Sequence, residues 1–447
     1  MFRRILVANR GEIAARILRA CERLEIETVV AHSDADRGAP WLEQATATVC
    51  LGPGRPSESY LCASAVLQAA DQTDCQALHP GYGFLAENAA FAARCEQQGL
   101  TFIGPGAAAI RRMGDKSAAK RTLAEHGLET IPGSAGILED VEHARSVADD
   151  VGYPVFLKAT AGGGGKGMRR CEDPGDLEAA FTAAALEARN AFGNASLYLE
   201  KLIEGGRHIE FQVLCDAYGS GVHLGERDCS IQRNNQKLVE ESPSPALTAA
   251  DRRRIGNRVA SALATSGYVN AGTVEFLQDP EGALYFMEVN ARLQVEHPVT
   301  EMISGVDLVE QQLRVAANEM LSFSQDDLRL SGHAIEFRIN AEDVDDGFRP
   351  DPGIISGLSV PNGRAEVRWD SAVREGYRIP PWYDSMIGKL IVHAKTRDAA
   401  LDRAARALAS LRIEGVKTTV ELHRRILQDA AFRAGSYDLN RLTEILG

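Results

Sequence analysis

Polar side chains recur at every second position in one central segment, LYFMEVNARLQVEHPV at residues 284–299. Apolar residues fill the positions between them. Because side chains of an extended chain alternate between two faces, this spacing predicts one apolar face and one polar face. The polar positions are Glu288, Asn290, Arg292, Gln294 and Glu296. A face that presents acid, amide, base, amide and acid in order is suited to an ionic ligand.

A metal site is predicted at the start of this row. A turn near Glu281-Gly282 would form a hairpin and bring Glu275 roughly opposite Glu288. Two facing carboxylates repel each other unless a cation lies between them, and magnesium in nucleotide enzymes takes carboxylates together with phosphate oxygens. Asn290 could complete the ligand shell. The alternative is a water-exposed face of an amphipathic sheet.

The end of the row suggests chemistry on a small anion. Arg292 presents a planar fork that suits a planar oxyanion. Glu296 could accept a proton from that anion, and a nearby arginine would keep the carboxylate ionised. The segment therefore predicts a metal-bound triphosphate beside a small planar acid that receives the phosphoryl group.

A glycine-rich stretch, TAGGGGKGM at residues 160–168, is a candidate phosphate loop. Gly162, Gly164 and Gly167 match G-x-G-x-x-G, but MRRCEDPGD follows in place of the helix that a dinucleotide fold needs. The Walker pattern also fails, because no Ser or Thr follows the lysine. A flexible loop whose backbone N–H groups surround phosphates remains, with a ligand-free hairpin as the alternative.

Two lysines lie near this loop in the predicted elements. Lys158 ends the strand before it, and Lys116 opens the preceding helix, so both suit the α- and β-phosphates of a nucleotide. The segment YLEKLI at 198–203 offers an acid and backbone groups of the kind that bind an adenine amine. Each lysine taken alone is also compatible with a solvated surface position.

Further candidates precede and follow the row. The loop at 226–243 is rich in amides and cations, including Gln232, Arg233 and Lys237, which favours an anion site. His208 opens a strand and is either a ligand or a structural imidazole. Arg338 stands on an otherwise apolar strand, so it needs a partner in a site or an interface.

The elements that must position these residues fall into three predicted domains. Residues 1–112 alternate strand-like and helix-like pieces, which is typical of a doubly wound α/β layer, and the first turn lacks the glycines of a dinucleotide site. Residues 113–330 hold strands, helices and the hairpin, with a mobile lid at about 131–204. Residues 331–447 are strand-rich and end in two amphipathic helices at roughly 397–412 and 417–430.

Bulk properties exclude several classes of protein. The 447 residues carry a formal net charge of −13, which argues against broad binding to nucleic acid or to anionic membranes. No stretch approaches the ~20 apolar residues that span a bilayer. The eight cysteines form no C-x-x-C pair, so reduced thiols in a cytoplasmic protein are expected.

At this point the sequence resembles the biotin carboxylase family of the ATP-grasp superfamily. The resemblance covers essentially the whole chain. It rests on ANRGEIAARILRA, HPGYGFLAEN, GDK, KATAGGGGKGM, ERDCSIQR, GTVEFL, EVNARLQVEHPVTE and PWYDSMIGKLI. It implies a Rossmann-like pre-ATP-grasp domain, an ATP-grasp domain with a glycine-rich lid and a C-terminal mixed α+β domain. The length resembles the free-standing bacterial subunit of acetyl-CoA carboxylase, an enzyme of fatty-acid synthesis.

The resemblance also implies a reaction and its residues. ATP would phosphorylate bicarbonate to carboxyphosphate, and CO₂ would pass to N1′ of biotin. Glu296 would deprotonate bicarbonate, Arg338 would stabilise the biotin enolate, and the released phosphate would remove the biotin proton. Bicarbonate would be bound by Lys237, Arg292, Gln294 and the backbone N–H of Val295, and two Mg²⁺ or Mn²⁺ ions by Glu275, Glu288 and Asn290. ATP would contact Lys116, Lys158, Gly164, Gly165, Glu200, Lys201, Leu202, Ile203, His208, Gln232, Asn235, Glu275 and Glu288.

The chain departs from the family pattern in one loop. The family commonly has Gln-Arg-Arg-His-Gln-Lys, whereas Asn234 and Asn235 replace the second Arg and the His here. Asn235 can still donate a hydrogen bond to a nucleotide, but a cationic contact is lost. Asn at the second of these two positions resembles some urea-carboxylating relatives, so the acceptor, whether an acyl-CoA, urea or pyruvate, stays open. Another ATP-grasp ligase acting through an acyl phosphate is the alternative function.

The resemblance implies partners as well. The chain has no Met-Lys dipeptide for biotin attachment, so the biotin carboxyl carrier protein and the carboxyltransferase are expected on separate chains. The family is typically a homodimer, and Arg16 with Arg19 on the first helix are interface candidates. An exposed helix face is the alternative for these two arginines.

Overall fold

The structure is a computed structural model that describes residues 1–160, 168–361 and 365–447. The predicted phosphate-loop residues Gly164 and Gly165 lie outside these ranges. The chain divides into two compact units. The first comprises Met1–Gly127, Arg207–Phe276 and Glu288–Gly447, and the second comprises Leu128–Gly206 and Leu277–Met287.

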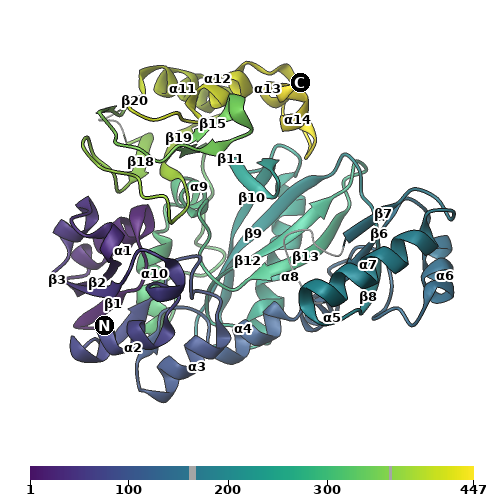
Figure 1. The fold of residues 1–447 in the computed structure, drawn as a ribbon, viewed down its shortest axis with the longest axis horizontal. Coiled ribbons are helices and arrows are strands. Elements are labelled where there is room, and N and C mark those ends of the chain that lie inside the picture. Colours follow the sequence, from purple (N-terminus) through teal and green to yellow (C-terminus); the bar gives the residue numbers. More distant parts are fainter. Residues whose placement is uncertain (161–167, 362–364) are drawn as a thin grey trace. The chain divides into compact units, whose positions relative to one another are not determined.

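The N-terminal part of the first unit is a parallel α/β layer, drawn in purple and blue in Figure 1. Its five strands lie in the order β3-β2-β1-β4-β5, which confirms the predicted doubly wound arrangement. The apolar runs of β1, β2 and β4 are buried, as expected for parallel strands covered by helices, whereas β3 is largely exposed. The strands are β1 (Arg4–Val7), β2 (Glu27–Ser33), β3 (Ala47–Gly52), β4 (Ala77–His79) and β5 (Thr101–Phe102). The helices are α1 (Gly11–Arg23), α2 (Ala63–Gln72), α3 (Ala89–Gln97) and α4 (Ala107–Gly114).

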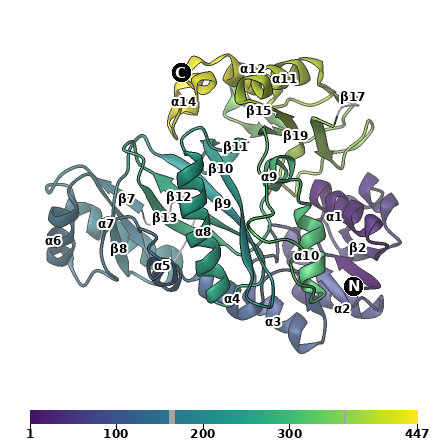
Figure 2. The same cartoon turned by 180° about the vertical axis from the view of Figure 1, so that it is seen from behind.

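A second, larger sheet has eight strands in the order β13-β12-β9-β10-β11-β14-β19-β18. Helix α8 (Ala249–Thr265) packs on β9 and β10, as Figure 2 shows. The strands are β9 (Arg207–Cys215), β10 (Gly221–Arg233), β11 (Gln236–Ser242), β12 (Asn270–Gln278), β13 (Leu284–Asn290), β14 (His333–Asn340), β18 (Val367–Ser371) and β19 (Met386–Ala394). The pairings β9–β10, β10–β11, β11–β14 and β14–β19 are antiparallel.

The two faces of this sheet differ in chemistry. On β14, Ile335, Phe337 and Ile339 point into an apolar core, whereas Glu336 and Arg338 point to the opposite face. The core is closed by the C-terminal helices α11 (Arg397–Ser410), α12 (Val420–Gln428), α13 (Ala430–Ala434) and α14 (Arg441–Leu446). The two predicted terminal helices are therefore confirmed, and α13 and α14 extend the layer. The opposite face is left for charged groups.

Short elements complete the first unit. The helices α5 (Lys116–Ala124), α9 (His297–Ser304) and α10 (Leu308–Ala316) connect its parts. The short strands are β15 (Glu342–Asp343), β16 (Arg349–Pro350), β17 (Gly357–Ser359) and β20 (Arg412–Glu414). The 3₁₀ turns lie at Asp34–Asp36, Pro40–Gln44, Pro56–Glu58 and Val344–Asp346.

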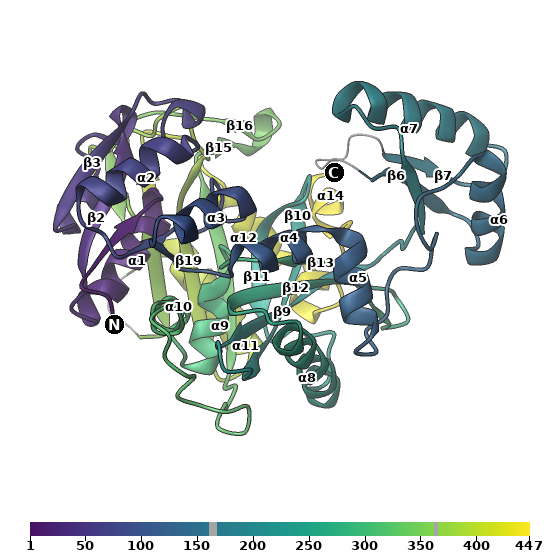
Figure 3. The same cartoon turned by 90° about the horizontal axis from the view of Figure 1, so that it is seen from below.

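The second unit is a small α+β body. Its three-stranded sheet has the order β7-β6-β8, with β6 (Val155–Ala159), β7 (Met168–Cys171) and β8 (Leu197–Lys201). Helices α6 (Val141–Val151) and α7 (Leu177–Phe192) pack on this sheet and on each other (Figure 3). Small residues such as Ala148 and Ala184 line the shared core and allow close packing. The predicted lid span, about 131–204, falls within this unit, and its mobility stays a prediction.

The segment at 284–299 is not the single extended face that its spacing predicted. Strand β13 ends at Asn290, and α9 begins at His297 with Pro298 in its first turn. Proline suits that position because its fixed φ matches a helix and its missing N–H is not needed there. Where the strand ends, the N–H of Ala291 donates to the Glu87 carboxylate at 3.0 Å. The prediction is wrong beyond Asn290.

Two expectations on cysteines and membranes can be compared with the structure. The eight cysteines are free thiols, and five of them are buried, which confirms that they are unpaired. Within the described parts of the chain, no helix combines the length and the apolar character needed to cross a membrane.

Candidate active site

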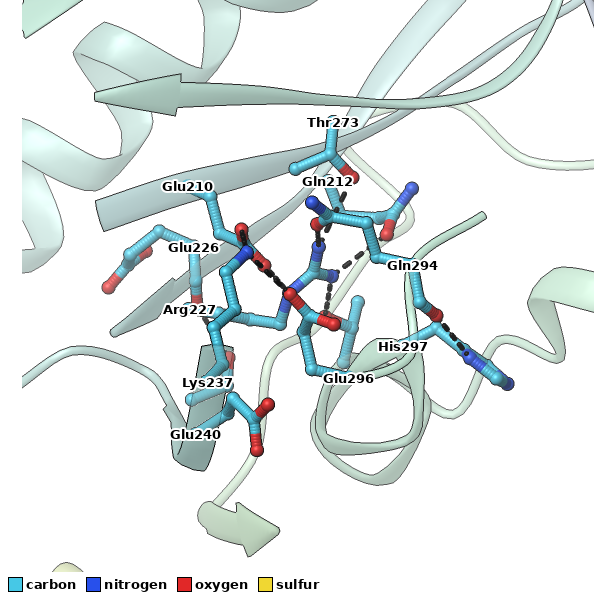
Figure 4. A network of polar contacts seen from close by, with 12 residues as sticks. Glu210, Gln212, Glu226, Arg227, Lys237, Glu240, Thr273, Gln294, Glu296 and His297 are labelled. Atoms are coloured by element: carbon cyan, nitrogen blue, oxygen red, sulfur yellow. Dashed lines mark hydrogen bonds and ion pairs between the residues drawn. The ribbon is translucent and has the colours of Figure 1, made fainter. Parts of the chain in front are cut away.

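A buried arginine organises the polar face of the large sheet. Arg227 on β10 is fully buried, and each of its three guanidinium nitrogens donates a hydrogen bond (Figure 4). Its acceptors are Glu210 at 2.5 Å, Gln212 and Gln294 at 2.8 Å, Thr300 at 2.9 Å and Thr273 at 3.1 Å. Such a bonded cation fixes the side chains around it, because buried polar groups need partners.

Sequence reasoning missed Arg227, Glu210 and Gln212. A signal was present in β9, where the sequence HIEFQV alternates polar and apolar residues. Glu210 and Gln212 share one face of that strand by this period. The alternation could have marked a second polar face beside the predicted row.

Lys237 lies at the centre of three carboxylates. Its ammonium donates to Glu210 at 2.5 Å, to Glu296 at 2.6 Å and to Glu275 at 3.0 Å. Burial alone would lower the pKa of Lys237, but these carboxylates outweigh it and raise the pKa well above its usual value. The group is therefore a fixed positive charge. Figure 4 shows it between Glu210 and Glu296.

The two oxygens of Glu296 are each bound by a different cation. Lys237 donates to one oxygen, and Arg338 donates to the other at 3.0 Å. Burial would raise the pKa of Glu296, but Lys237, Arg338 and Arg227 hold it well below its usual range. The carboxylate is thus ionised at neutral pH, as a proton acceptor requires.

Arg338 has the partner that its place on an apolar strand led us to expect. Its Nε donates to Glu240 at 2.5 Å, in addition to the bond with Glu296. Glu240 is fully buried, and that burial raises its pKa although Arg338 opposes the shift. The guanidinium is held between two carboxylates and has its orientation set by both.

Glu275 joins the predicted metal and anion groups. Its Oε1 accepts hydrogen bonds from Gln294 at 2.7 Å and from Asn290 at 2.8 Å. Its other oxygen lies 3.0 Å from His208 Nε2, and Gln232 lies beside the same ring. Burial would raise the pKa of Glu275, but Lys237 and His208 hold it well below its usual range.

Arg292 is held at the edge of this group. Its Nε donates to Glu87 at 2.8 Å, and one Nη donates to Asn290 Oδ1 at 2.9 Å. Glu87, in the loop before α3, was not predicted, and no local pattern in the sequence marks it. Burial lowers the pKa of Arg292, but Glu87 outweighs it and raises the pKa, so the fork stays charged.

The backbone N–H of Val295 is available to a ligand. Across residues 1–160, 168–361 and 365–447, no acceptor takes a hydrogen bond from it. The neighbouring carbonyls are bonded: His297 Nδ1 lies 2.8 Å from Gln294 O, and Lys389 Nζ donates to Val295 O at 2.7 Å. The carbonyls of both adjoining peptides are thus anchored, whereas the N–H of Val295 has no acceptor among the described residues.

Glu288 lies apart from the buried cluster. Its side chain is 44% exposed, and its contact is with Lys116, 3.7 Å away. Lys116 opens α5, as predicted. The structure therefore brings Glu275 and Asn290 together, while Glu288 stays at the solvent side with a lysine.

The predicted metal ligands fit magnesium in type. Glu275, Glu288 and Asn290 all supply oxygen atoms, the ligands that this ion prefers. A second group with ligand chemistry, His208, Glu210 and Glu275, has its ligand atoms within 4.8 Å of one another. The Lys237 ammonium contacts both of those glutamates, so that space already holds a cation.

Five of the nucleotide candidates belong to the second unit: Lys158, Glu200, Lys201, Leu202 and Ile203. Lys158 on β6 donates to Glu200 on β8 at 2.6 Å. The Lys201 ammonium donates to the carbonyls of Gly152 and Tyr153 at 2.9 and 2.8 Å. The N–H of Leu202 donates to Pro154 O at 3.0 Å, and Ile203 follows it. The strand pairing β6–β8 brings Lys158 and Glu200 together.

The loop that differs from the family pattern, at residues 232–237, forms a tight hairpin between β10 and β11. Arg233 pairs with Gln236, so Asn234 and Asn235 are the two turn residues. Both have positive φ, 49° and 63°. Asparagine adopts this conformation more readily than most side chains, and it is favoured in such turns. The Asn pair is thus explained by the turn, and its contact with a nucleotide stays a prediction.

Arg16 is not on an exposed helix face. It is buried and donates to Glu301 and Asp307, each at 2.7 Å. Arg19 is 36% exposed and pairs with Asp370 at 3.2 Å. Both charges are satisfied within the chain.

Comparisons with known proteins agree with this architecture. The chain matches "Biotin carboxylase, N-terminal domain" over residues 1–110, "Carbamoyl-phosphate synthase L chain, ATP binding domain" over 115–324, and "Biotin carboxylase C-terminal domain" over 336–444. It is 52% identical to a biotin carboxylase of Nostoc sp. over 444 residues, 99% of each chain.

Solved structures give the same result. The biotin carboxylase domain dimer of the Hydrogenobacter thermophilus 2-oxoglutarate carboxylase, in complex with MgADP, ADP and bicarbonate, superposes with a TM-score of 0.93. That domain is 48% identical, over 100% of this chain and 99% of the other. The biotin carboxylase of Campylobacter jejuni, solved as a β-γ-ATP complex, gives 0.94 at 45% identity, over 99% of both chains.

The fold and site define an ATP-grasp protein, in which a parallel α/β layer precedes an antiparallel sheet with a charged face. Within that class, the chain belongs to the biotin carboxylase family.

Proposed function

We propose that this chain is a biotin carboxylase that uses ATP and bicarbonate to carboxylate biotin on a carrier protein. One observation carries the proposal: the ionised Glu296 is bound by Lys237 and Arg338, close to the free N–H of Val295 in the same turn. The two cations and the backbone N–H can bind a small anion. The carboxylate between the cations can then accept a proton from that anion.

The anion step follows from these groups. Lys237, Arg292, Gln294 and the N–H of Val295 bind bicarbonate, and Glu296 removes its proton. The resulting oxyanion attacks the γ-phosphorus of ATP, ADP leaves, and carboxyphosphate forms. Lys237 and Arg292 stabilise the charge that develops, because fixed cations in a buried site need little reorganisation.

The transfer step uses the opposite side of Glu296. Carboxyphosphate releases CO₂ and phosphate, and the phosphate takes the proton from N1′ of biotin. The nitrogen then attacks CO₂. Arg338 stabilises the negative charge on the ureido oxygen, and its bonds to Glu240 and Glu296 hold the guanidinium in one orientation.

ATP is bound with its magnesium ions by the nucleotide and metal candidates named above. We assign the phosphates to Lys116, Lys158, Gly164 and Gly165, and the base and ribose to a set comprising Glu200, Lys201, Leu202, Ile203, His208, Gln232 and Asn235. Glu275, Glu288 and Asn290 would hold the metal ions, which neutralise phosphate charge when bound. The three domains, 1–112, 113–330 and 331–447, with a lid at about 131–204 that closes over ATP, complete the proposal.

The proposed partners are separate chains. Homodimer assembly is supported by the dimeric neighbour from Hydrogenobacter thermophilus, and we extend it to this chain. Carrier protein and carboxyltransferase are the further partners, with acetyl-CoA as the proposed final acceptor. The free thiols favour a cytoplasmic location. The acceptor would be identified by supplying the carboxylated carrier protein to carboxyltransferases that act on acetyl-CoA, 2-oxoglutarate or pyruvate. The transferase that forms its carboxylated product would indicate the acceptor.

A kinetic experiment tests the activity. The purified chain is given MgATP with and without bicarbonate and free biotin, and ADP release is followed. We expect ADP release to need bicarbonate and to rise with biotin. ATP turnover that ignores both would instead indicate another ATP-grasp ligase that joins an acyl phosphate to a different nucleophile.

A further inference from the structure

Three of the sequence motifs behind the family resemblance have no role in the proposed reaction: ANRGEIAA, HPGYGFL and DSMIGKLI. One residue from each meets at a single buried point in the first unit. Glu12 comes from α1, Tyr82 from the loop after β4, and Lys389 from β19.

Lys389 is a fully buried lysine with two anchored contacts. Its side chain is 0% exposed, and its ammonium lies 3.1 Å from Glu12 Oε1. The same ammonium donates to Val295 O at 2.7 Å. Tyr82 donates its hydroxyl to Glu12. A buried charge needs such partners to offset its lost hydration.

The placement of Lys389 follows from β19. Its neighbours Leu390 and Val392 belong to the apolar core on one side of the sheet. Lys389 and Leu390 are adjacent, so their side chains point to opposite faces. Lys389 therefore points to the charged face, next to Arg338 in the paired strand β14.

The contact with Val295 concerns the site itself. The carbonyls of Gln294 and Val295 are held by His297 and Lys389, respectively. These peptides carry the free N–H of Val295 and lead directly into Glu296. Fixing their carbonyls fixes where the donor and the carboxylate point.

We propose that Lys389, anchored by Glu12 and Tyr82, is a positioning residue that aligns the Gln294–Glu296 peptide for bicarbonate. This rests on the proposed function. Lys389 does not touch the substrate; it acts through the backbone of Val295. The defect on its removal should therefore appear in bicarbonate use, while ATP binding, which depends on other residues, is retained.

The test uses a double variant, because Lys389→Met alone leaves the Glu12 carboxylate buried without its cation. Glu12→Gln with Lys389→Met removes both charges, keeps an oxygen that accepts from Tyr82, and retains most of the lysine stem volume. We expect its melting temperature to recover toward wild type relative to Lys389→Met. We expect kcat/KM for bicarbonate to fall about 100-fold through misalignment, with KM for ATP unchanged.

A second variant and a control complete the design. Glu12→Gln alone retains Lys389. We expect this variant also to lower kcat/KM for bicarbonate while leaving KM for ATP unchanged, but by a smaller factor than the double variant. Lys395→Met, an exposed lysine just beyond β19, should match wild type. A double variant with wild-type bicarbonate kinetics, or with equal losses for ATP and bicarbonate, overturns the inference. If wild-type protein itself shows no bicarbonate-dependent ADP release, the proposed function fails instead.

Discussion

The charged site of the first unit and the nucleotide candidates of the second are built differently. In the first unit, Lys237 contacts three buried carboxylates, and Arg227 bonds to five side chains. In the second, Lys158 pairs with one carboxylate and Lys201 with two backbone carbonyls. The Lys158 side chain is 22% exposed, against 10% for Lys237.

This difference separates a pre-organised site from one that its ligand completes. A fully bonded buried network holds each member in place before any substrate arrives, and its members act together. Isolated pairs near solvent are weaker and are screened by salt. Substitutions in the first unit should therefore change both stability and chemistry, whereas those in the second should mainly change nucleotide binding.

The largest effect is expected for Glu296→Gln, which keeps the shape but removes the proton acceptor. Carboxylation of free biotin should fall by up to about 10⁴-fold, the upper end of the range of about 10²- to 10⁴-fold for general base catalysis. Equilibrium binding of MgATP should be retained, because the assigned ATP contacts are elsewhere. Glu58→Gln, at an exposed position, is the matched control. Retained carboxylation would remove Glu296 from the role of base.

Lys237→Met should come next, with a combined defect. We expect kcat/KM for bicarbonate to fall about 10²- to 10³-fold, as when a fixed donor to a developing anion is removed. Three buried carboxylates lose their shared cation, which should destabilise the protein by about 3–5 kcal/mol in urea unfolding. Lys395→Met serves as the control. An unchanged unfolding midpoint would contradict the network interpretation.

Acid should unfold the first unit in part through Glu241. Burial opposes ionisation, but His333 and Arg397 lower the pKa of Glu241 from 4.5 to about 2. A depressed folded pKa means that this stabilisation is present above pH 4.5 and is lost as the pH falls toward 2. The shift corresponds to about 3 kcal/mol.

Glu241→Gln provides the measurement. Urea unfolding at pH 6 and at pH 3 should show a smaller loss of stability for the variant than for wild type. An equal loss in the two proteins would show that other carboxylates account for the acid sensitivity.

The smallest effect is expected for Lys158→Met in the second unit. Losing one charge-assisted contact to a phosphate should raise KM for ATP about tenfold. KM for bicarbonate and the unfolding midpoint should change little. Arg145→Met, on α6 of the same unit with one ion-pair partner, is the control. A bicarbonate defect as large as that of Lys237→Met would end the distinction between the two units.

Much of the fold could be predicted because it depends on local patterns. The parallel strands of the N-terminal layer, the β12–β13 hairpin and the terminal helices follow from apolar periodicity and turn residues. Lys116 at the start of α5 and Lys158 near the end of β6 were also placed correctly by their neighbours in sequence. The extended face at 288–296 was wrong, because the strand ends at Asn290 and the next N–H, of Ala291, bonds to Glu87, which is far away in sequence.

By itself, the sequence determined which residue types are present and how they alternate along each strand. Residue type and alternation are local properties, so they determine where helices and strands form and which residues belong to the polar row. Only the tertiary structure decided that Arg227 and Glu210 support the row, that Glu87 holds Arg292, and that Lys389 reaches Val295. Each of these contacts joins separate strands or loops, and the order of strands in a folded sheet decides which of them become neighbours.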